Sequence, residues 1–421
     1  MEWREPLRLL VGNRRFAALW GSDLVATIGD RVHRVALAAL VYELTGSMTV
    51  AGLAFLASGL PDLLLGPLAG VVVDRVDRRR VMIASDLARV LPVVLLPIAA
   101  EYWIGSLYLL LFMINAASIL HRPAKMASIP AVVPPSQLTT ANSLSSLAES
   151  LGDIGGYPLA GLVVGGLVSV MGSRHGLEAA FAVAALGYVV SALILWPLRL
   201  PPLVVGSDRS VRVVWRELVG GVRFLVDQPL VRTNTLLVAL GAIAIGMAMP
   251  LLVGYAYARP ERGEVTYSLL NFGIGVGSVA GAILVGTLNT RRLATLVVLG
   301  LVVMGTGLTG LGLEPPLWVG VMLTGLTGLG NLLFLVPSVT IVQRVTPANL
   351  MGRVFALRST ILFTALIAAN GLGGWLGDDL GAGRAFLVVG SGLIIMTVAL
   401  SLLPATRQAD RLDDLMLEPS G

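Results

Sequence analysis

Acidic side chains interrupt two long apolar segments in the first half of the chain. Asp23 and Asp30 are seven residues apart in the first segment, and Glu149 and Asp153 are four apart in a later one. Either spacing places both carboxylates on one face of a helix. At about 1.5 Å per helical residue, Asp30 lies about 21 Å and Glu149 about 18 Å beyond the predicted starts of their helices. Carboxylates at such depth in a membrane are costly and typical of ion and proton pathways, so Asp30, Glu149 and Asp153 predict a site that loads and releases a proton or a cation.

Basic residues near these acids allow a second interpretation. Arg31 and Arg34 lie on the same predicted helix and could neutralise the acids as structural ion pairs. A third interpretation is direct contact between the acids and a substrate. Asp62, in the middle of the next apolar segment, is a further candidate for a polar cavity. Asp86 and Arg89 are three residues apart, which predicts an ion pair within one helix.

The elements that must position these residues are membrane-spanning helices. Of the 421 residues, 56% are hydrophobic and 13% are charged, and the mean hydropathy is +0.84. Soluble domains contain about 45–50% apolar and about 25% charged residues, so an ordinary soluble protein is excluded. Since a spanning helix needs roughly 20 apolar residues, the chain is predicted to be an all-α polytopic membrane protein with twelve transmembrane helices. We place them at residues 16–44, 49–73, 81–100, 104–121, 137–171, 177–197, 232–257, 266–288, 293–313, 317–342, 349–377 and 385–404.

Several functional classes lack the residues that they require. The chain has no cysteine, which excludes disulfides and thiolate metal sites. A glycine-rich phosphate-binding loop is absent, so ATP-driven transport is not expected. We find no metal-ligand spacing and no nucleophile–base pair. We therefore expect a protein that is not an enzyme and that uses no metal and no cofactor except a coupling proton or cation.

Basic residues indicate how the chain crosses the membrane. The sequence contains 30 basic and 25 acidic residues, and every basic residue except Lys125 is an arginine. These residues gather in alternate loops, including residues 75–80, 122–125 and 291–292. By the positive-inside rule, both termini and the central loop are cytoplasmic in a multi-pass protein of the cell membrane. The basic excess thus indicates topology and contact with the lipid bilayer rather than nucleic acid binding.

An internal repeat divides the chain into two halves. The pattern at residues 133–138, Val-Pro-Pro-Ser-Gln-Leu, returns as Val-Thr-Pro-Ala-Asn-Leu at residues 345–350, displaced by half the chain. Two six-helix bundles in parallel repeat are expected. We assign residues 1–198 to the N-terminal bundle, 199–231 to a cytoplasmic linker with an amphipathic helix at 211–226, and 232–421 to the C-terminal bundle with a short cytoplasmic tail.

A dense group of charges separates the second and third predicted helices. It consists of Asp74, Arg75, Asp77, Arg78, Arg79 and Arg80, and it must form a short aqueous loop because hydrocarbon does not admit such a group. Gly66 and Gly70, four residues apart on the helix before it, predict a bare stripe against which another helix packs closely.

This loop resembles the signature of the major facilitator superfamily, Gly-x-x-x-Asp-Arg-x-Gly-Arg-Arg. The matching residues are Gly70, Asp74, Arg75, Arg78 and Arg79, with Asp77 in place of the second glycine. Further phrases in the first half resemble a bacterial branch with macrolide-efflux-like, siderophore-exporter-like and lysophospholipid-transporter-like members; they include residues 13–16, 29–30, 41–47 and 141–144. The resemblance implies the major facilitator fold and transport by alternating access.

The resemblance also implies a gate on the cytoplasmic side. In this family the acid of the loop, here Asp74, faces the start of the eleventh helix, here near Leu350 to Arg353, where the helix dipole is positive. Arg353 and Arg358 could add ion pairs to that contact. The other interpretation is that the loop arginines only enforce topology.

Residues 152–161 and a set of neutral polar side chains bear on direction and substrate. The segment Gly152–Gly161 resembles the Gly-Pro motif of superfamily exporters, with Tyr157 replacing the glycine before Pro158, and favours export. Asn115 stands where proton-coupled drug antiporters carry an arginine in the fourth helix. The residues that we assign to the substrate cavity are Asn115, Tyr157, Asn234, Asn271, Asn331 and Asn370. Neutral walls of this kind suit an amphipathic or hydrophobic molecule.

The leading hypothesis is a monomeric secondary transporter that exports amphipathic, drug-like small molecules by alternating access and is driven by protons. A lysophospholipid or lipid transporter or flippase is one alternative. Another is a cation-coupled carrier or a carrier of a metal or metal chelate, with the acidic residues as its binding site.

Overall fold

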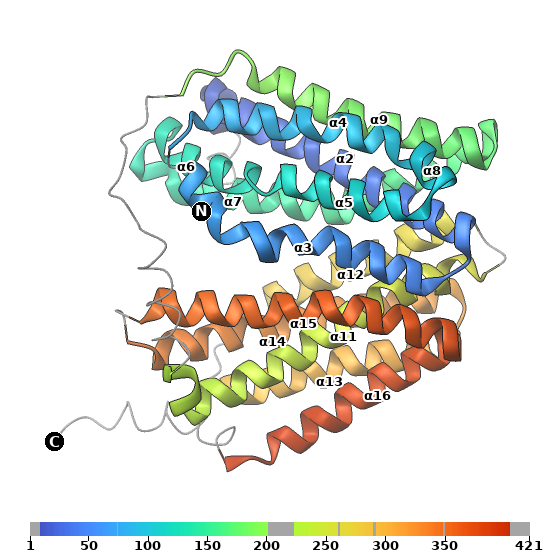
Figure 1. Ribbon diagram of the computed structural model, residues 1–421. Helices are drawn as coiled ribbons and strands as arrows, with labels where there is room; N and C mark the ends of the chain where they lie inside the picture. The colour runs from blue at the N-terminus through green and yellow to red at the C-terminus, as the bar shows by residue number, and fades with distance from the viewer. Residues whose placement is uncertain are drawn as a thin grey trace. The chain divides into compact units, whose positions relative to one another are not determined.

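The structure, a computed structural model, describes residues 9–73, 75–200, 223–259, 262–288, 292–347 and 350–404. All regular structure within these ranges is helical, which confirms the predicted all-α class (Figure 1). The elements of the first half are α2 (Arg14–Thr45), α3 (Met48–Val73), α4 (Arg78–Tyr102), α5 (Ile104–Ser118), α6 (His121–Val132), η1 (Pro135–Gln137), α7 (Leu138–Leu151), η2 (Gly152–Gly156), α8 (Tyr157–Met171) and α9 (Ser173–Leu195). Those of the second half are α11 (Pro229–Tyr257), α12 (Gly263–Thr287), α13 (Leu293–Leu311), α14 (Leu317–Val345), α15 (Met351–Leu380) and α16 (Ala382–Ser401).

In the described part of the chain, eleven helical segments are long enough and apolar enough to cross a membrane. They include α5 with α6 as one segment and η1 through α8 as another. The long helix α2 is outside that set because Asp23, Asp30, Arg31 and Arg34 all lie within it. With α2 as the remaining span, the predicted twelve-helix architecture is confirmed.

Local sequence signals account for several helix ends. Asn13 caps α2 by accepting a hydrogen bond from the Phe16 N–H at 3.1 Å, and Gly46 ends the same helix in the left-handed region at φ 60°. Asp77 caps α4 by accepting from the Arg80 N–H at 2.9 Å. Asp77, which replaces the second glycine of the signature loop, is therefore the N-cap of α4.

The fourth predicted span, residues 104–121, agrees with α5, which ends at Ser118. After a turn at residues 119–120 the chain forms α6, so Arg122 and Lys125 lie on a helix and not in the predicted loop. Helix α6 can carry Lys125 because this side chain finds a buried acidic partner, as described below.

The chain divides into two compact units. Unit 1 consists of Met1–Gly46, Leu53–Asp208 and Ala256–Leu269, and unit 2 of Ser47–Gly52, Arg209–Tyr255 and Leu270–Gly421. Each half thus lends a short segment to the other unit, which the predicted boundaries at 198 and 232 do not include. Most of the predicted amphipathic helix at 211–226 lies outside the described residues.

In unit 1, α2 packs along α8 and α9, and α4 packs along α5 and α9 (Figure 1). An apolar cluster that includes Leu19, Met82, Ala124 and Leu195 joins α2, α4, α6 and α9. In unit 2, α13 lies between α14 and α16. A smaller cluster there joins Val231, Val342 and Val354 of α11, α14 and α15.

Candidate functional site

Arg89 links two acids in the interior of unit 1. Its guanidinium contacts Asp86 of the same helix through Nη2 and Asp30 of α2 through Nη1, the latter at 3.3 Å. The Tyr188 hydroxyl donates to the same Asp30 oxygen at 2.6 Å, and the Arg89 guanidinium lies 4.1 Å from the centre of the Tyr188 ring. The side chain of Arg89 is 4% exposed and that of Asp86 is 0% exposed, whereas that of Asp30 is 40% exposed. The predicted Asp86–Arg89 pair is confirmed, and it is one part of a larger network.

Close helix packing brings Asp30 to its partners. A Cβ on Gly29 would lie 3.1 Å from the Ala184 carbonyl oxygen, and one on Gly187 would lie 3.3 Å from the Gly29 Cα. Two glycines that face each other let α2 and α9 approach to backbone contact. Since Asp30 and Tyr188 follow these glycines directly, the approach sets the short hydrogen bond between them.

Asp86 anchors the buried end of this network. Its second oxygen accepts a hydrogen bond from the Ser191 hydroxyl at 2.6 Å, and His121 Nδ1 of α6 lies 3.2 Å from its first oxygen. A charge with no exposure needs several such partners. Helices α4, α6 and α9 therefore all meet at Asp86.

A second ion pair joins α2 to the predicted exporter motif. Arg31 Nη2 lies 2.7 Å from Asp153 Oδ1, and the Arg31 guanidinium lies 5.2 Å from the centre of the Tyr157 ring. Asp153 belongs to η2, a π-helical turn, and such turns are frequent at functional sites. A Cβ on Gly152 would overlap Thr27, and one on Gly156 would lie 3.1 Å from Arg31 Cγ. The glycines of the motif are what allow this turn to reach α2.

Two further acids pair in contrasting surroundings. Lys125 Nζ lies 2.7 Å from Asp23 Oδ2, with side chains 5% and 14% exposed. Arg122 Nη2 lies 3.6 Å from Glu149 Oε1, and both of these side chains are largely exposed. The expected cluster of Asp30, Glu149 and Asp153 is therefore distributed: in the described chain each of the three pairs with a different arginine.

The placement of the remaining predicted residues of unit 1 is simple. Arg34 and Asp62 are exposed, and Asn115 donates to the Leu111 carbonyl of its own helix at 2.9 Å. Tyr157 is buried beside Arg31.

Sequence reasoning missed Tyr188, His121 and the role of Lys125. As the only lysine, Lys125 carried a signal, but its position next to Arg122 favoured a loop. Tyr188 lies in an apolar run that resembles ordinary helix core, and nothing in its sequence neighbourhood points to Asp30.

The structure places Arg78 and Arg79 of the predicted loop in the first turn of α4, where both are bound within unit 1. Arg78 donates to the Ala127 carbonyl at 2.7 Å, and Arg79 donates to the Leu195 carbonyl at 3.2 Å and to the Trp196 carbonyl. Arg75 is exposed. Asp74 lies outside the described residues, and no contact is described for Gly70. A Cβ on Gly66 would meet no atom within 4 Å, and the close packing predicted there stays a prediction.

The residues predicted for the gate and the cavity in unit 2 are mostly engaged with backbone. Arg358 is buried and donates to the Ser338 hydroxyl and, at 3.3 Å, to the Ser338 carbonyl. Asn234 donates to that same carbonyl at 3.0 Å, and Asn370 donates to the Leu366 carbonyl at 3.0 Å. Asn271 is buried, and Asn331 and Arg353 are half-buried.

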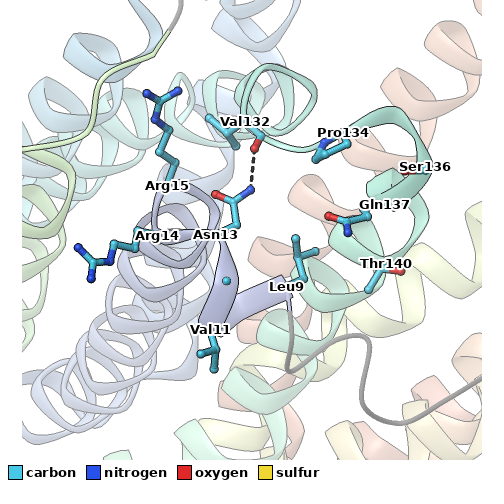
Figure 2. A pocket seen from close by; sticks show the side chains of 11 residues that line it. Leu9, Val11, Asn13, Arg14, Arg15, Val132, Pro134, Ser136, Gln137 and Thr140 are labelled. Atoms are coloured by element: carbon cyan, nitrogen blue, oxygen red, sulfur yellow. Dashed lines mark hydrogen bonds between the residues drawn. The ribbon is translucent and has the colours of Figure 1, made fainter.

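A pocket of about 860 Å³ lies at the start of α2 (Figure 2). It is lined by Leu9, Val11, Gly12, Asn13, Arg14, Arg15, Val132, Pro134, Ser136, Gln137 and Thr140. The Asn13 amide donates to the Val132 carbonyl at 2.7 Å and so joins the two walls. Arg14 and Arg15 extend away from Gln137 and Thr140 in Figure 2. No predicted site residue lines this pocket.

Comparison with known proteins agrees with this architecture. A family model described as transmembrane secretion effector matches residues 6–419. Macrolide efflux protein A of Streptococcus pyogenes is 27% identical over 413 residues, which cover 94% of this chain and 97% of that protein. The multidrug efflux pump Tap of Mycolicibacterium fortuitum is 27% identical over 434 residues, which cover 97% of this chain and 98% of the pump.

A solved structure shows the same fold at low sequence identity. The crystal structure of the nucleoside transporter NupG aligns with a TM-score of 0.74 and 9% identity, over 92% of this chain and 98% of that one. The helical architecture, the signature loop and the family match over nearly the whole chain lead to one conclusion: the protein belongs to the transmembrane secretion effector family of major facilitator transporters, and it is a multi-pass membrane transporter rather than an enzyme.

Proposed function

We propose that this protein is a secondary active exporter of amphipathic, drug-like small molecules and that proton binding at Asp30 drives it. The observation that carries the proposal is the sharing of one buried arginine, Arg89, between an accessible acid and an inaccessible one. Asp30 is the member of this network with substantial exposure, so it is the group that protons can reach.

The second acid explains how Asp30 can change its charge. If Arg89 had Asp30 as its only partner, protonation of Asp30 would leave a buried and unpaired cation, which is strongly destabilising. Asp86 keeps Arg89 paired in either state, with support from Ser191. Protonation then weakens the contacts of α2 with α4 and α9 without unfolding the unit. A change in helix packing that depends on one proton is what coupling requires.

The other acids of unit 1 take supporting roles in this proposal. Asp153 is held by Arg31 at the π-helical turn, where it ties the position of α2 to the exporter motif. Glu149 is exposed and paired loosely with Arg122, and it offers a second group for proton exchange.

The proposed substrate class rests on the relatives and on the neutral second half. The matching proteins are named for efflux of macrolides and of multiple drugs. The polar residues predicted for the cavity in the second half are uncharged asparagines, which suit an amphipathic molecule. We propose export from a cytoplasm that contains both chain termini, as the arginine distribution indicates.

A cytoplasmic gate between the residue 74–80 loop and the start of α15 is part of the same proposal. The hydrogen bonds of Arg78 and Arg79 to the Ala127 and Leu195 carbonyls support it, because they fix the start of α4, directly after the loop, within unit 1. In this proposal Asp74 faces the positive end of α15.

Transport by the purified protein in liposomes under an imposed pH gradient tests the proposal. A macrolide, a cationic dye, a lysophospholipid and a divalent cation are assayed in parallel. We expect the macrolide and dye to accumulate with the gradient, and Asp30→Asn to abolish that accumulation while substrate exchange without a gradient continues. Asp379→Asn, the same charge change at an exposed acid of α15, is the matched control and should retain coupling.

Two results would contradict this proposal. Undiminished gradient-driven accumulation in Asp30→Asn would remove the coupling role of that acid. Transport of lysophospholipid alone, or of the divalent cation alone, would replace drug export with lipid transport or cation transport.

A further inference from the structure

The turn between α2 and α3 is bound to the last turn of α15. Asp378 accepts hydrogen bonds from the Ser47 hydroxyl at 2.6 Å, the Met48 N–H at 2.7 Å and the Thr49 N–H at 3.0 Å. The first N–H groups of a helix have no partner inside the helix and carry partial positive charge, so a carboxylate there stabilises the helix end. Asp378 therefore caps α3 from a distant part of the sequence. We call Asp378 with Ser47, Met48 and Thr49 the Asp378 cap.

Glycines bring the two helices together behind this carboxylate. A Cβ on Gly374 would overlap the Met48 carbonyl, and a Cβ on Gly52 would overlap the Asn370 carbonyl. One on Gly377 would lie 2.7 Å from Met48 Sδ. Backbone-to-backbone contact of this kind needs small residues at each crossing point. The first turn of α3 is thus seated closely on α15 as well as hydrogen-bonded to it.

The position of the cap within the chain gives it mechanical significance. Residues 47–52 pack with unit 2, whereas α3 from Leu53 onward belongs to unit 1. One helix is therefore shared between two compact units. Since two-bundle transporters work by rocking one bundle against the other, such motion must either open the Asp378 cap or bend α3 near Gly52.

We propose that the Asp378 cap is a latch that is closed in this structure and opens once in each transport cycle. The inference rests on the proposed alternating-access function. Helix α15 begins on the predicted cytoplasmic side, so its last turn, with Asp378, lies on the opposite side. The family resemblance implies an acid at the end of the second span that faces the start of the eleventh. Here an acid at the end of the eleventh span caps the start of the second span. The same interaction, a carboxylate at a helix N-terminus, would then act on both sides of the membrane.

Distance measurement by electron paramagnetic resonance tests the latch directly, since the natural chain has no cysteine to compete for spin labels. Spin labels are attached at Val170→Cys and Leu313→Cys. Both residues are exposed; Val170 lies at the end of α8 and Leu313 lies just after α13. A second pair, Val76→Cys with Leu288→Cys, reports on the predicted cytoplasmic side. Measurements use the full-length protein in liposomes.

We expect Asp378→Ala to increase the fraction of molecules with a longer Val170–Leu313 label distance, raising the ratio of open to closed about fivefold, as for loss of a helix N-cap. Ser47→Ala should shift the ratio in the same direction by less. Asp379→Ala, the same truncation at the adjacent exposed residue, is the control and should leave the distribution unchanged. If Asp378→Ala and Asp379→Ala give the same distribution, the latch is wrong.

This readout separates the latch from the proposed coupling. The label distances require no substrate and no pH gradient. A shift in Asp378→Ala together with failure of gradient-driven transport in the parent protein would support the latch and contradict proton coupling. Normal gradient-driven transport together with an unshifted label distance would support proton coupling and contradict the latch.

Discussion

Both units contain close contacts at glycines, and they differ in how their buried cations are bound. In unit 1, Arg89 pairs with Asp86 and Lys125 pairs with Asp23, and these ion pairs have little exposure. In unit 2, the buried Arg358 donates to the neutral Ser338, and the helices that surround α14 meet at glycines. A Cβ on Gly277 of α12 would overlap the Gly325 carbonyl, and one on Gly300 of α13 would lie 2.8 Å from the Gly330 carbonyl.

This difference indicates which unit can respond to a change in protonation. The energy of an ion pair depends on the charge of each partner, so packing that relies on ion pairs changes when an acid gains a proton. Contacts between glycine backbones and carbonyls have no such dependence. We infer that the packing of unit 1 depends more strongly on protonation than the packing of unit 2.

The largest expected effect comes from removing the shared arginine. Arg89→Met leaves Asp86 buried without its cation, and breaking a buried pair on one side costs about 3–5 kcal/mol. We expect the variant to unfold at a much lower temperature than the parent protein in detergent, as followed by intrinsic fluorescence. The double variant Asp86→Asn with Arg89→Met removes both charges and should recover most of the loss. Equal stability of Arg89→Met and the parent protein would show that the network does not hold unit 1 together.

A glycine substitution tests the other side of the comparison. Gly277→Ala places a methyl group against a backbone carbonyl that cannot move aside, and overpacking of this kind costs roughly 1–3 kcal/mol. Gly286→Ala, on the same helix with nothing within 4 Å of its Cβ, is the matched control. Because alanine favours a helix over glycine by about 0.5–1 kcal/mol, the control should match or exceed the parent protein in thermal stability. If both variants behave alike, glycine packing does not distinguish unit 2.

The sequence predicts some of the structural features behind these experiments and not others. Most of the spanning helices could be predicted because they are apolar runs long enough to cross a bilayer, and the Asp86–Arg89 pair could be predicted because its spacing fits one helical turn. The contact of Arg89 with Asp30 could not, because it depends on the Gly29–Gly187 approach of two helices that are far apart in sequence.

Charge and glycine patterns have limits when they are read locally. Lys125 looked like a loop residue because charged residues are expensive in a membrane, and only the fold shows that Asp23 neutralises it. Glycine spacing likewise does not say which helix is the partner: Gly277 and Gly281, four residues apart, pack on α14. In both cases the missing information is the position of a second helix.

The smallest expected effect concerns the exposed pair of Arg122 and Glu149. Their atoms lie 3.6 Å apart, and both side chains are largely exposed, so water screens the attraction. Glu149→Gln should therefore change the free energy of unfolding by at most about 0.5 kcal/mol, in contrast to Arg89→Met. The same thermal measurement in low and high salt checks this, since a weak exposed pair loses what little it contributes as salt rises. A loss comparable to that of Arg89→Met would mean that Glu149 belongs to the buried network, and the predicted grouping of Glu149 with Asp30 would regain support.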